Sequence, residues 1–169
     1  MFEQLNLLSD ADRILSLIRK GESKTLEFKE TLLLDVKKKT KEKYIEKSVL
    51  KTIVGFLNTD GGTLLVGVSD DGVIRGLQDE ISRFHKNPDK FLLHFKNLIK
   101  TQIGEEFYPD INYRNVDISG KSVLLVECNA TNRPCWLNRK EFYVRINPAT
   151  DLLEGPKLVE YISRRFPHT

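Results

Sequence analysis

The sequence predicts an α+β fold, in which one domain has a mainly antiparallel central sheet flanked by helices. Segments with the 3.6-residue apolar period of helices alternate with segments that have the two-residue period of strands. Strand-like segments follow one another between residues 111 and 146 with short breaks, which favours antiparallel neighbours. The 169 residues, 40% hydrophobic and 30% charged, match one soluble globular domain over 1–169, with its core over about 15–166.

The N-terminal third contains two helix patterns and one strand pattern. Residues 9–20 open with a serine that can cap a helix and carry their apolar residues on one side. Over 26–29 apolar and charged residues alternate, so a half-exposed strand is predicted with Glu27 pointing away from the core. After a lysine-rich connection at 35–43, apolar residues recur at helical spacing over 43–58, which predicts the longest N-terminal helix.

The middle of the chain begins with a strong break at 58–62, which is rich in Asn, Asp and Gly. A buried strand is predicted at 63–68, followed by an Asp-Gly hairpin turn and a second short strand at 73–76. Residues 88–102 start with a proline and have the apolar spacing of a second long helix.

The C-terminal third is dominated by strand patterns. Strands are predicted at 111–118 and 121–128, joined by a Ser-Gly turn, then in a short piece at 135–137 and again at 141–146. The tail at 152–166 has one apolar face and arginines in its last turn, where cations interact well with the helix dipole, so a final helix is predicted.

Several function classes are excluded by what the sequence lacks. No window approaches the roughly 18 apolar residues of a membrane span, and the first residues do not resemble a signal peptide, so we expect a cytoplasmic protein without a membrane partner. No GxxxxGK[ST] loop is present, which argues against an ATPase; Gly61 and Gly62 fit a tight turn that needs positive φ. The histidines and the two cysteines show no zinc-ligand spacing.

Basic residues fall into two groups that suit DNA or RNA as a partner. The net charge of +3 and the pI near 8.8 mildly favour a polyanion. The candidate phosphate contacts of the first group are Lys29, Lys37, Lys38, Lys39, Lys43, Lys47 and Lys51. Those of the second group are Arg133, Arg139 and Arg145, interleaved with aromatic residues that could stack on bases. A solvated lysine face and simple sheet packing are the structural alternatives; we expect packing for Phe142 and exposure for Arg145.

Three motifs in order carry a family resemblance: ESKTLEFK at 22–29, IVGFLNTDGGTLLVGVSDDGVIRG at 53–76 and EFYVRINPATDLL at 141–153. The series resembles the AlbA_2 domain of Schlafen-type proteins, in a single-domain bacterial or archaeal form. The middle motif is the most specific, because a polar stop, a double glycine, an apolar strand and an acidic hairpin rarely occur together. The resemblance implies an α+β fold with a mainly antiparallel sheet, and a role in binding DNA or RNA.

The resemblance also points to an acidic trio. In Schlafen members that cut RNA, carboxylates at the positions of Glu22, Glu27 and Asp70 are implied to be catalytic and to bind Mg²⁺ or Mn²⁺. Asp71 competes with Asp70, and Ser69 occupies another position where an acidic residue would match. Schlafens build a clamp from two lobes, so a homodimer would be needed to mimic it. The structural alternative is that Glu27 pairs with a lysine, Lys29 or Lys51, and that the aspartates serve the turn.

Three functions therefore compete. The first is a nucleic-acid-binding domain that contacts the phosphate backbone through its basic groups, without a required cofactor. The second is a divalent-metal-dependent endoribonuclease that acts on structured RNA such as tRNA, so whether the protein is an enzyme stays open. The third is a protein-interaction domain, for which the apolar residues nearest the N-terminus could form the docking segment: Phe2, Leu5, Leu7 and Leu8.

Overall fold

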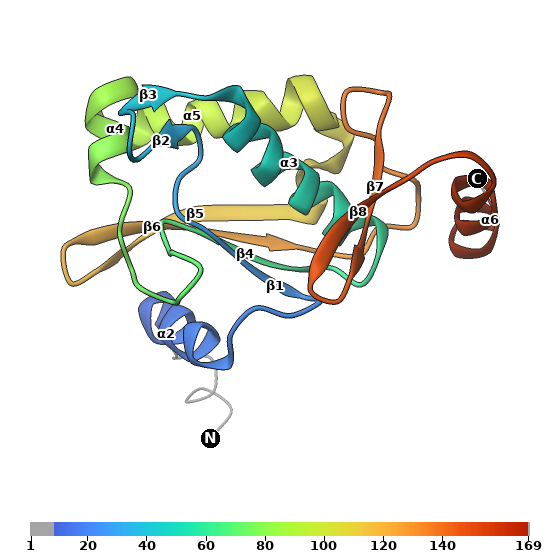
Figure 1. The fold of residues 1–169 in the computed structure, drawn as a ribbon, viewed down its shortest axis with the longest axis horizontal. Helices are drawn as coiled ribbons and strands as arrows, with labels where there is room; N and C mark the ends of the chain where they lie inside the picture. The colour runs from blue at the N-terminus through green and yellow to red at the C-terminus, as the bar shows by residue number, and fades with distance from the viewer. Residues whose placement is uncertain (1–8, 169) are drawn as a thin grey trace.

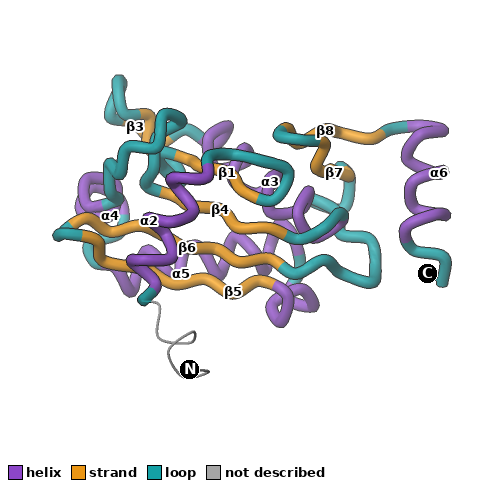
Figure 2. Tube along the Cα trace, turned by 90° about the horizontal axis from the view of Figure 1, so that it is seen from below, coloured by secondary structure: helices purple, strands orange, loops and turns teal. Residues whose placement is uncertain are grey.

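The computed structural model describes residues 9–168 and has the predicted α+β architecture. One sheet lies between helical layers, with α3 and α5 over one face and α2 on the other (Figures 1 and 2). The elements have these bounds along the chain: α2 (Asp10–Lys20), β1 (Leu26–Lys29), β2 (Leu34–Asp35), β3 (Thr40–Lys41), α3 (Lys43–Asn58), β4 (Gly62–Val66), α4 (Gln78–Phe84), α5 (Pro88–Leu98), η1 (Ile99–Ile103), η2 (Glu105–Asp110), β5 (Ile111–Ile118), β6 (Lys121–Cys128), β7 (Phe142–Ile146), β8 (Ala149–Leu153) and α6 (Gly155–Arg165).

The main sheet has the strand order β1-β4-β6-β5. Strand β1 pairs in parallel with β4, whereas the β4–β6 and β5–β6 pairs are antiparallel. The parallel pair requires a crossover, which α3 provides between β1 and β4. The predicted mainly antiparallel sheet is therefore confirmed, and the parallel strand β1 lies at its edge.

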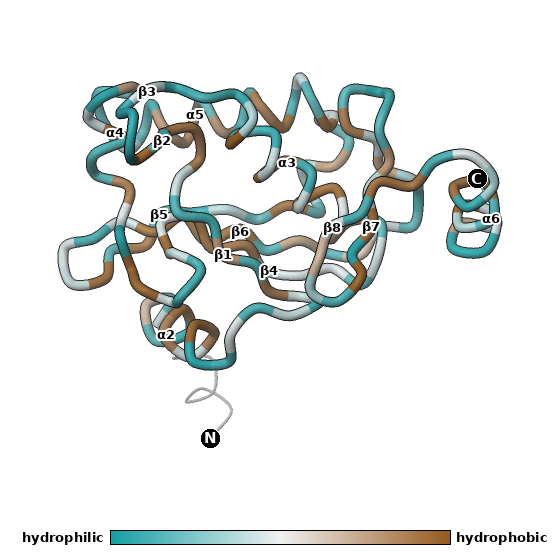
Figure 3. The backbone as a smooth tube through the Cα atoms, in the orientation of Figure 1, coloured by the Kyte–Doolittle hydropathy of each residue, from teal (hydrophilic) through white to brown (hydrophobic). Residues whose placement is uncertain are grey.

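Side-chain alternation along the strands builds two apolar layers. Leu26 and Phe28 of β1 pack with α2 on one face of the sheet. Leu64 of β4 packs on the opposite face, in the larger core cluster that α3 and α5 cover. Glu27 is directly opposite Leu64 in the register, so its side chain lies on the α3 face. Figure 3 shows the corresponding hydrophobic segments along the strands between the helical layers.

The two N-terminal helices form where the sequence predicts them. The Ser9 hydroxyl accepts a hydrogen bond from the backbone N–H of Asp12 at 3.1 Å and caps α2, which Gly21 ends. The buried face of α3 is mainly apolar, with Glu46 and Thr52 also buried, and the helix ends at Asn58. The Asn58 side chain is buried and hydrogen-bonds the backbone of Cys135 and Tyr143, so it ties the end of the helix to the C-terminal strands.

The double glycine between α3 and β4 is a tight turn, as predicted, but each glycine is needed for a different reason. Gly61 has φ +75°, a region that other residues rarely adopt. Gly62 has no positive φ; a Cβ there would come within 2.6 Å of the Phe56 ring. The turn therefore depends on backbone conformation at the first glycine and on close packing at the second.

Several element predictions were wrong. The final helix, predicted at 152–166, begins only at Gly155, because residues 149–153 form strand β8. The helix predicted at 88–102 is α-helical only to Leu98 and continues as the π-helical turn η1. The pieces at 73–76 and 135–137 contribute isolated bridges rather than strands. The short hairpin β2–β3 and the seven-residue helix α4 were not predicted.

The β7–β8 hairpin forms a two-stranded sheet of its own beside α3. It approaches the helix closely at Gly55, where a Cβ would meet Thr150 at 3.2 Å and Arg145 at 3.4 Å. The other side of the hairpin packs against α6 through a third apolar cluster that includes Phe142, whose predicted packing is confirmed. This placement brings Arg145 of β7 towards β1.

The N-terminal apolar residues proposed as a docking segment lie outside the described residues. Within residues 9–168, no helix is both long and apolar enough to cross a membrane.

Candidate nucleic-acid interface

Two carboxylates from the edge of the sheet meet on the α3 side. Glu22 lies just after α2, and Glu27 lies in β1. Burial, and after it contact with the carboxylate of Glu27, raises the pKa of Glu22 to about 7. The negative charge of Asp70 acts in the same direction, whereas Lys29 opposes it. The structure therefore brings Glu22 and Glu27 together, with Asp70 near enough to act through its charge.

The turn after β4 distinguishes the two neighbouring aspartates. The carboxylate of Asp71 is hydrogen-bonded by the Ser69 hydroxyl, and this bond lowers the pKa of Asp71. Ser69 also bonds the backbone of Val73, so Ser69 and Asp71 hold the turn. Asp71 is therefore engaged in the turn, and Asp70 is the aspartate whose charge raises the pKa of Glu22.

Carboxylate oxygens are suitable ligands for Mg²⁺ or Mn²⁺. However, within the part of the chain that the structure describes, no group of three His, Cys, Asp or Glu side chains is placed to hold a metal ion. Both oxygens of Glu27 already face cations, since Lys29 Nζ lies 3.5 Å from Oε1 and Arg145 Nη1 lies 3.2 Å from Oε2. The side chains as placed therefore do not form a ready metal site.

The predicted exposure of Arg145 was wrong, because its side chain is only 1% exposed. Its guanidinium donates to the backbone carbonyls of Ser23 and Lys24, as well as to Glu27 and Thr150. The guanidinium also lies over the Phe56 ring, 4.9 Å from its centroid. Arg145 is thus a buried support for the segment that carries the two glutamates, and its donors are not available to an external phosphate.

A groove begins beside the acidic pair and runs between α3 and the β2–β3 hairpin. Its cavity of about 370 Å³ is lined by Lys29, Leu34, Lys37, Tyr44 and Ser48 among others. Lys29 stands at the inner end, where its ammonium group bonds the Ser48 hydroxyl at 2.8 Å as well as facing Glu27. Tyr44 is 62% exposed and its hydroxyl bonds Asp35. The predicted pairing of Glu27 with Lys29 is confirmed.

Sequence reasoning missed Tyr44 and Ser48 as lining residues. Tyr44 offered a signal, because it is an aromatic residue outside the apolar face of the predicted helix and within the lysine-rich region. Ser48 offered none, since its role depends on the packing of β1 against α3.

Two lysines of the first basic group, Lys29 and Lys37, line this groove, and the others lie on the β2–β3 hairpin and on α3, where they are not equally available. Lys39 pairs with Asp79 at 3.0 Å and Lys47 pairs with Glu141 at 2.9 Å. Four further lysines of the group form no side-chain hydrogen bond or ion pair with any residue between 9 and 168; they are Lys37, Lys38, Lys43 and Lys51. These four are the ones best suited to phosphate.

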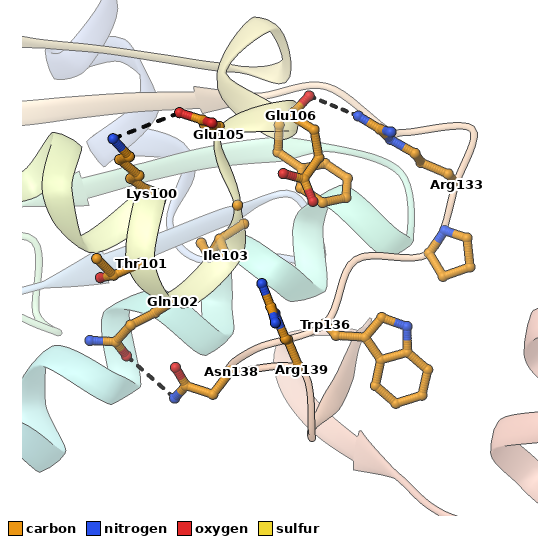
Figure 4. Close-up of a pocket in the computed structure, with 13 residues that line it drawn as sticks. Lys100, Thr101, Gln102, Ile103, Glu105, Glu106, Arg133, Trp136, Asn138 and Arg139 are labelled. Atoms are coloured by element: carbon orange, nitrogen blue, oxygen red, sulfur yellow. Dashed lines mark hydrogen bonds and ion pairs between the residues drawn. The ribbon is translucent and has the colours of Figure 1, made fainter.

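The two remaining arginines of the second basic group, Arg133 and Arg139, lie elsewhere. They line a cavity of about 610 Å³ formed by η1, η2 and the connection between β6 and β7 (Figure 4). The hairpin with its lysines lies at the opposite end of α3 from this connection (Figure 1). The structure therefore does not join the two basic groups into one patch.

Comparison with known proteins places the fold. A family model described as Schlafen, AlbA_2 matches residues 22–154, which confirms the resemblance of the three motifs. The crystal structure of the DIP2311 protein from Corynebacterium diphtheriae matches 98% of this chain at 17% identity and a TM-score of 0.60, and the match covers only 29% of the DIP2311 chain. A search among curated proteins found no match.

A second solved structure is similar over nearly its whole length. It is the solution structure of the N-terminal domain of a protein from Nitrosomonas europaea described as related to the ATP-dependent DNA helicase RecG. The match covers 88% of this chain and 97% of that domain, at 18% identity and a TM-score of 0.52. At such identities the two structures support the fold alone.

Proposed function

Because this chain belongs to the Schlafen AlbA_2 family, we propose that it is a nucleic-acid-binding domain that contacts the phosphate backbone along the groove beside α3. The observation that carries the proposal is a set of lysines on the β2–β3 hairpin and α3 that form no side-chain hydrogen bond or ion pair within residues 9–168: Lys37, which lines the groove, and Lys38, Lys43 and Lys51. The helicase-related description of one structural neighbour is consistent with such a role.

The spacing of the lysines on α3 supports this reading. Lys43, Lys47 and Lys51 recur every four residues, so they stand in one row on the helix surface. Like charges at this spacing destabilise a helix slightly, and only Lys47 has a carboxylate partner. A phosphate backbone along the row would neutralise the repulsion and release its own counterions. Lys29 would meet a phosphate at the inner end of the groove.

The experiment measures binding of labelled tRNA and duplex DNA by fluorescence anisotropy at several salt concentrations. The double variant Lys37→Glu/Lys38→Glu should bind more weakly than the wild type and should show a shallower salt dependence, because fewer counterions are released. The matched control reverses Lys20 on α2 and Lys157 on α6, which changes the net charge equally on other surfaces. Equal losses in both variants would indicate a nonspecific charge effect and would contradict the proposal.

A second candidate function, metal-assisted cleavage of structured RNA, is favoured by one observation. Burial, together with the neighbouring carboxylate of Glu27, raises the pKa of Glu22 to about 7, and a divalent cation would relieve the repulsion between the two glutamates. The cation would supply charge neutralisation at a scissile phosphate. Since Glu27 is held by Lys29 and Arg145, the glutamates would have to rearrange first.

Cleavage is tested separately from binding. The protein is incubated with end-labelled tRNA and either Mn²⁺ or chelator, and the products are resolved on a gel beside those of Glu27→Gln. Discrete fragments that require both metal and Glu27 would establish the nuclease, and a dimer in solution would be consistent with a two-lobed clamp. Intact RNA that is bound but not cut would leave the binding domain.

A further inference from the structure

The second cavity, far from the groove, has the composition of a nucleotide pocket. It is formed where η1 and η2 face the 131–140 connection, and its volume of about 610 Å³ lies within the usual range for small-ligand sites. Figure 4 shows Arg139 pointing into the space between Ile103 and Trp136. Nothing in the backbone groove or in the acidic pair uses these residues.

Trp136 and Arg139 both line this cavity. Trp136 packs on one side against Phe142, with ring centroids 5.2 Å apart, and is half-buried. It also lines the cavity, so part of the indole is open to a ligand. Within residues 9–168, the Arg139 guanidinium has no hydrogen bond or ion pair. A half-buried indole and such a guanidinium in one cavity suit stacking of a base together with binding of its phosphate.

The walls of the cavity are held in place by contacts with the protein. Arg133 donates to the carbonyl of Glu106 at 2.9 Å, and its guanidinium lies over the Phe107 ring at 4.9 Å. The backbone N–H of Asn138 donates to the carbonyl of Gln102 at 2.8 Å, which ties the connection to η1. These bonds fix the spacing of the two walls, so little ordering would be needed when a ligand binds.

The backbone on both sides is unusual in a way that often accompanies binding sites. Asn138 and Arg139 both have positive φ, at 54° and 59°, which is uncommon for residues other than glycine. The facing segment Ile99–Ile103 is a π-helical turn, a rare element that is frequent at functional sites. Unusual backbone conformations therefore occur on both walls of the cavity.

The charged side chains that line the cavity indicate a ligand with a small negative charge. Lys100, Arg133 and Arg139 are opposed by Glu105 and Glu106, which leaves a small positive excess. This balance suits a single phosphate and not a polyphosphate. The amide side chains of Gln102 and Asn138, 3.5 Å apart at the rim, and the carboxylates can hydrogen-bond the edge of a base.

We infer that this cavity binds one unpaired nucleotide of a single strand, with its base stacked on Trp136 and its phosphate on Arg139. The inference deepens the proposed function and rests on it, because a single strand held here would be part of the nucleic acid that the groove binds. A nucleotide within a duplex cannot enter, since its base is stacked and paired. The cavity would therefore give the domain a preference for strands with unpaired segments.

The test uses the fact that Trp136 is the only tryptophan of the chain. The full chain is titrated with a labelled single-stranded oligonucleotide of about 10 nucleotides, or with the blunt duplex of the same sequence, and both anisotropy and tryptophan fluorescence are recorded. We expect quenching of Trp136 with the single strand only. Arg139→Gln should remove the quenching and weaken single-strand binding about tenfold, within the range for one base contact, without affecting duplex binding.

Matched controls separate the outcomes. Arg19→Gln removes an exposed arginine from α2, on the other face of the sheet, and should leave both signals unchanged. Single-strand binding without quenching, or equal effects of Arg139→Gln and Arg19→Gln, would overturn the inference and leave the proposed function intact. Quenching by polyglutamate as strong as that by the single strand would also overturn it, in favour of an acidic peptide. Absence of any anisotropy change with either nucleic acid would overturn both proposals.

Discussion

Replacing Arg145 with methionine tests the structural basis of the acidic pair. Methionine keeps an unbranched apolar stem but removes the charge, every donor of the guanidinium and its contact over the Phe56 ring. Glu27 would keep only Lys29, at 3.5 Å, as a cationic neighbour, and the carbonyls of Ser23 and Lys24 would lose their donor. The change thus leaves a largely buried carboxylate with incomplete compensation.

The expected magnitude follows from the burial of the pair. Removing one partner of a buried ion pair costs about 3–5 kcal/mol. Arg145 is 1% exposed and Glu27 is 14% exposed, so the pair qualifies as buried. Because Lys29 still offsets part of the charge, we expect a loss near the lower limit, about 3 kcal/mol of unfolding free energy. A domain of this size has about 5–15 kcal/mol in total, so the variant should still fold.

Urea unfolding followed by circular dichroism measures the loss. Arg133→Met is the matched control, because that guanidinium is exposed and bonds one carbonyl, so the cost there should stay below about 1 kcal/mol. Adding Glu27→Gln to the Arg145→Met variant should recover part of the stability, since the unpaired charge is then absent. Equal costs for the Arg145 and Arg133 variants would refute the view that Arg145 supports the glutamates.

Two further predictions concern buried polar residues. Burial raises the pKa of Glu80 from 4.5 to about 7, so between these pH values the folded protein keeps a proton that the unfolded chain has released. The free energy of unfolding should therefore fall as the pH rises from about 4.5 to about 7. In urea unfolding measured at successive pH values, Glu80→Gln should reduce this dependence of the unfolding free energy on pH. An unchanged slope would contradict it. Asn58→Ala removes the hydrogen-bond partner of three buried backbone groups, the carbonyls of Cys135 and Tyr143 and the N–H of Cys135, and should lower the free energy of unfolding by about 3 kcal/mol. Asn58→Asp keeps the acceptor for the Cys135 N–H, so its loss of unfolding free energy shows how much the two donated bonds contribute.

The parts of the fold that were predictable have strong local patterns. The alternation of 111–118 and 121–128 and the apolar spacing of 43–58 identify their elements without tertiary information. Strand β8 was not predictable in this way, because its burial is intermediate or exposed throughout and its residues show no clear alternation. The seven-residue helix α4 is too short for a reliable period.

In the candidate site too, residues within local motifs were predictable from the sequence and nonlocal contacts were not. The motif resemblance identified Glu22, Glu27 and Asp70, and the structure brings the first two into contact. Arg145 was read as exposed because a charged residue in a strand normally faces solvent. Its partner Glu27 is 118 residues away in the sequence, and no local pattern reveals such a pair. Burial of a charge depends on a nonlocal partner, so sequence periodicity alone is a poor guide to it.

The contacts of Lys29 connect the groove with the acidic pair. Its ammonium group bonds the Ser48 hydroxyl at 2.8 Å within the groove and lies 3.5 Å from Glu27 outside it. A phosphate at the inner end of the groove would compete with Glu27 for this cation, because charge-assisted bonds to phosphate are strong. Glu27 would then be held by Arg145 alone, with one oxygen released beside Glu22. Binding of the nucleic-acid backbone would in this way increase the uncompensated negative charge at Glu22 and Glu27 while a phosphodiester lies next to them. A divalent cation would be attracted most strongly under this condition.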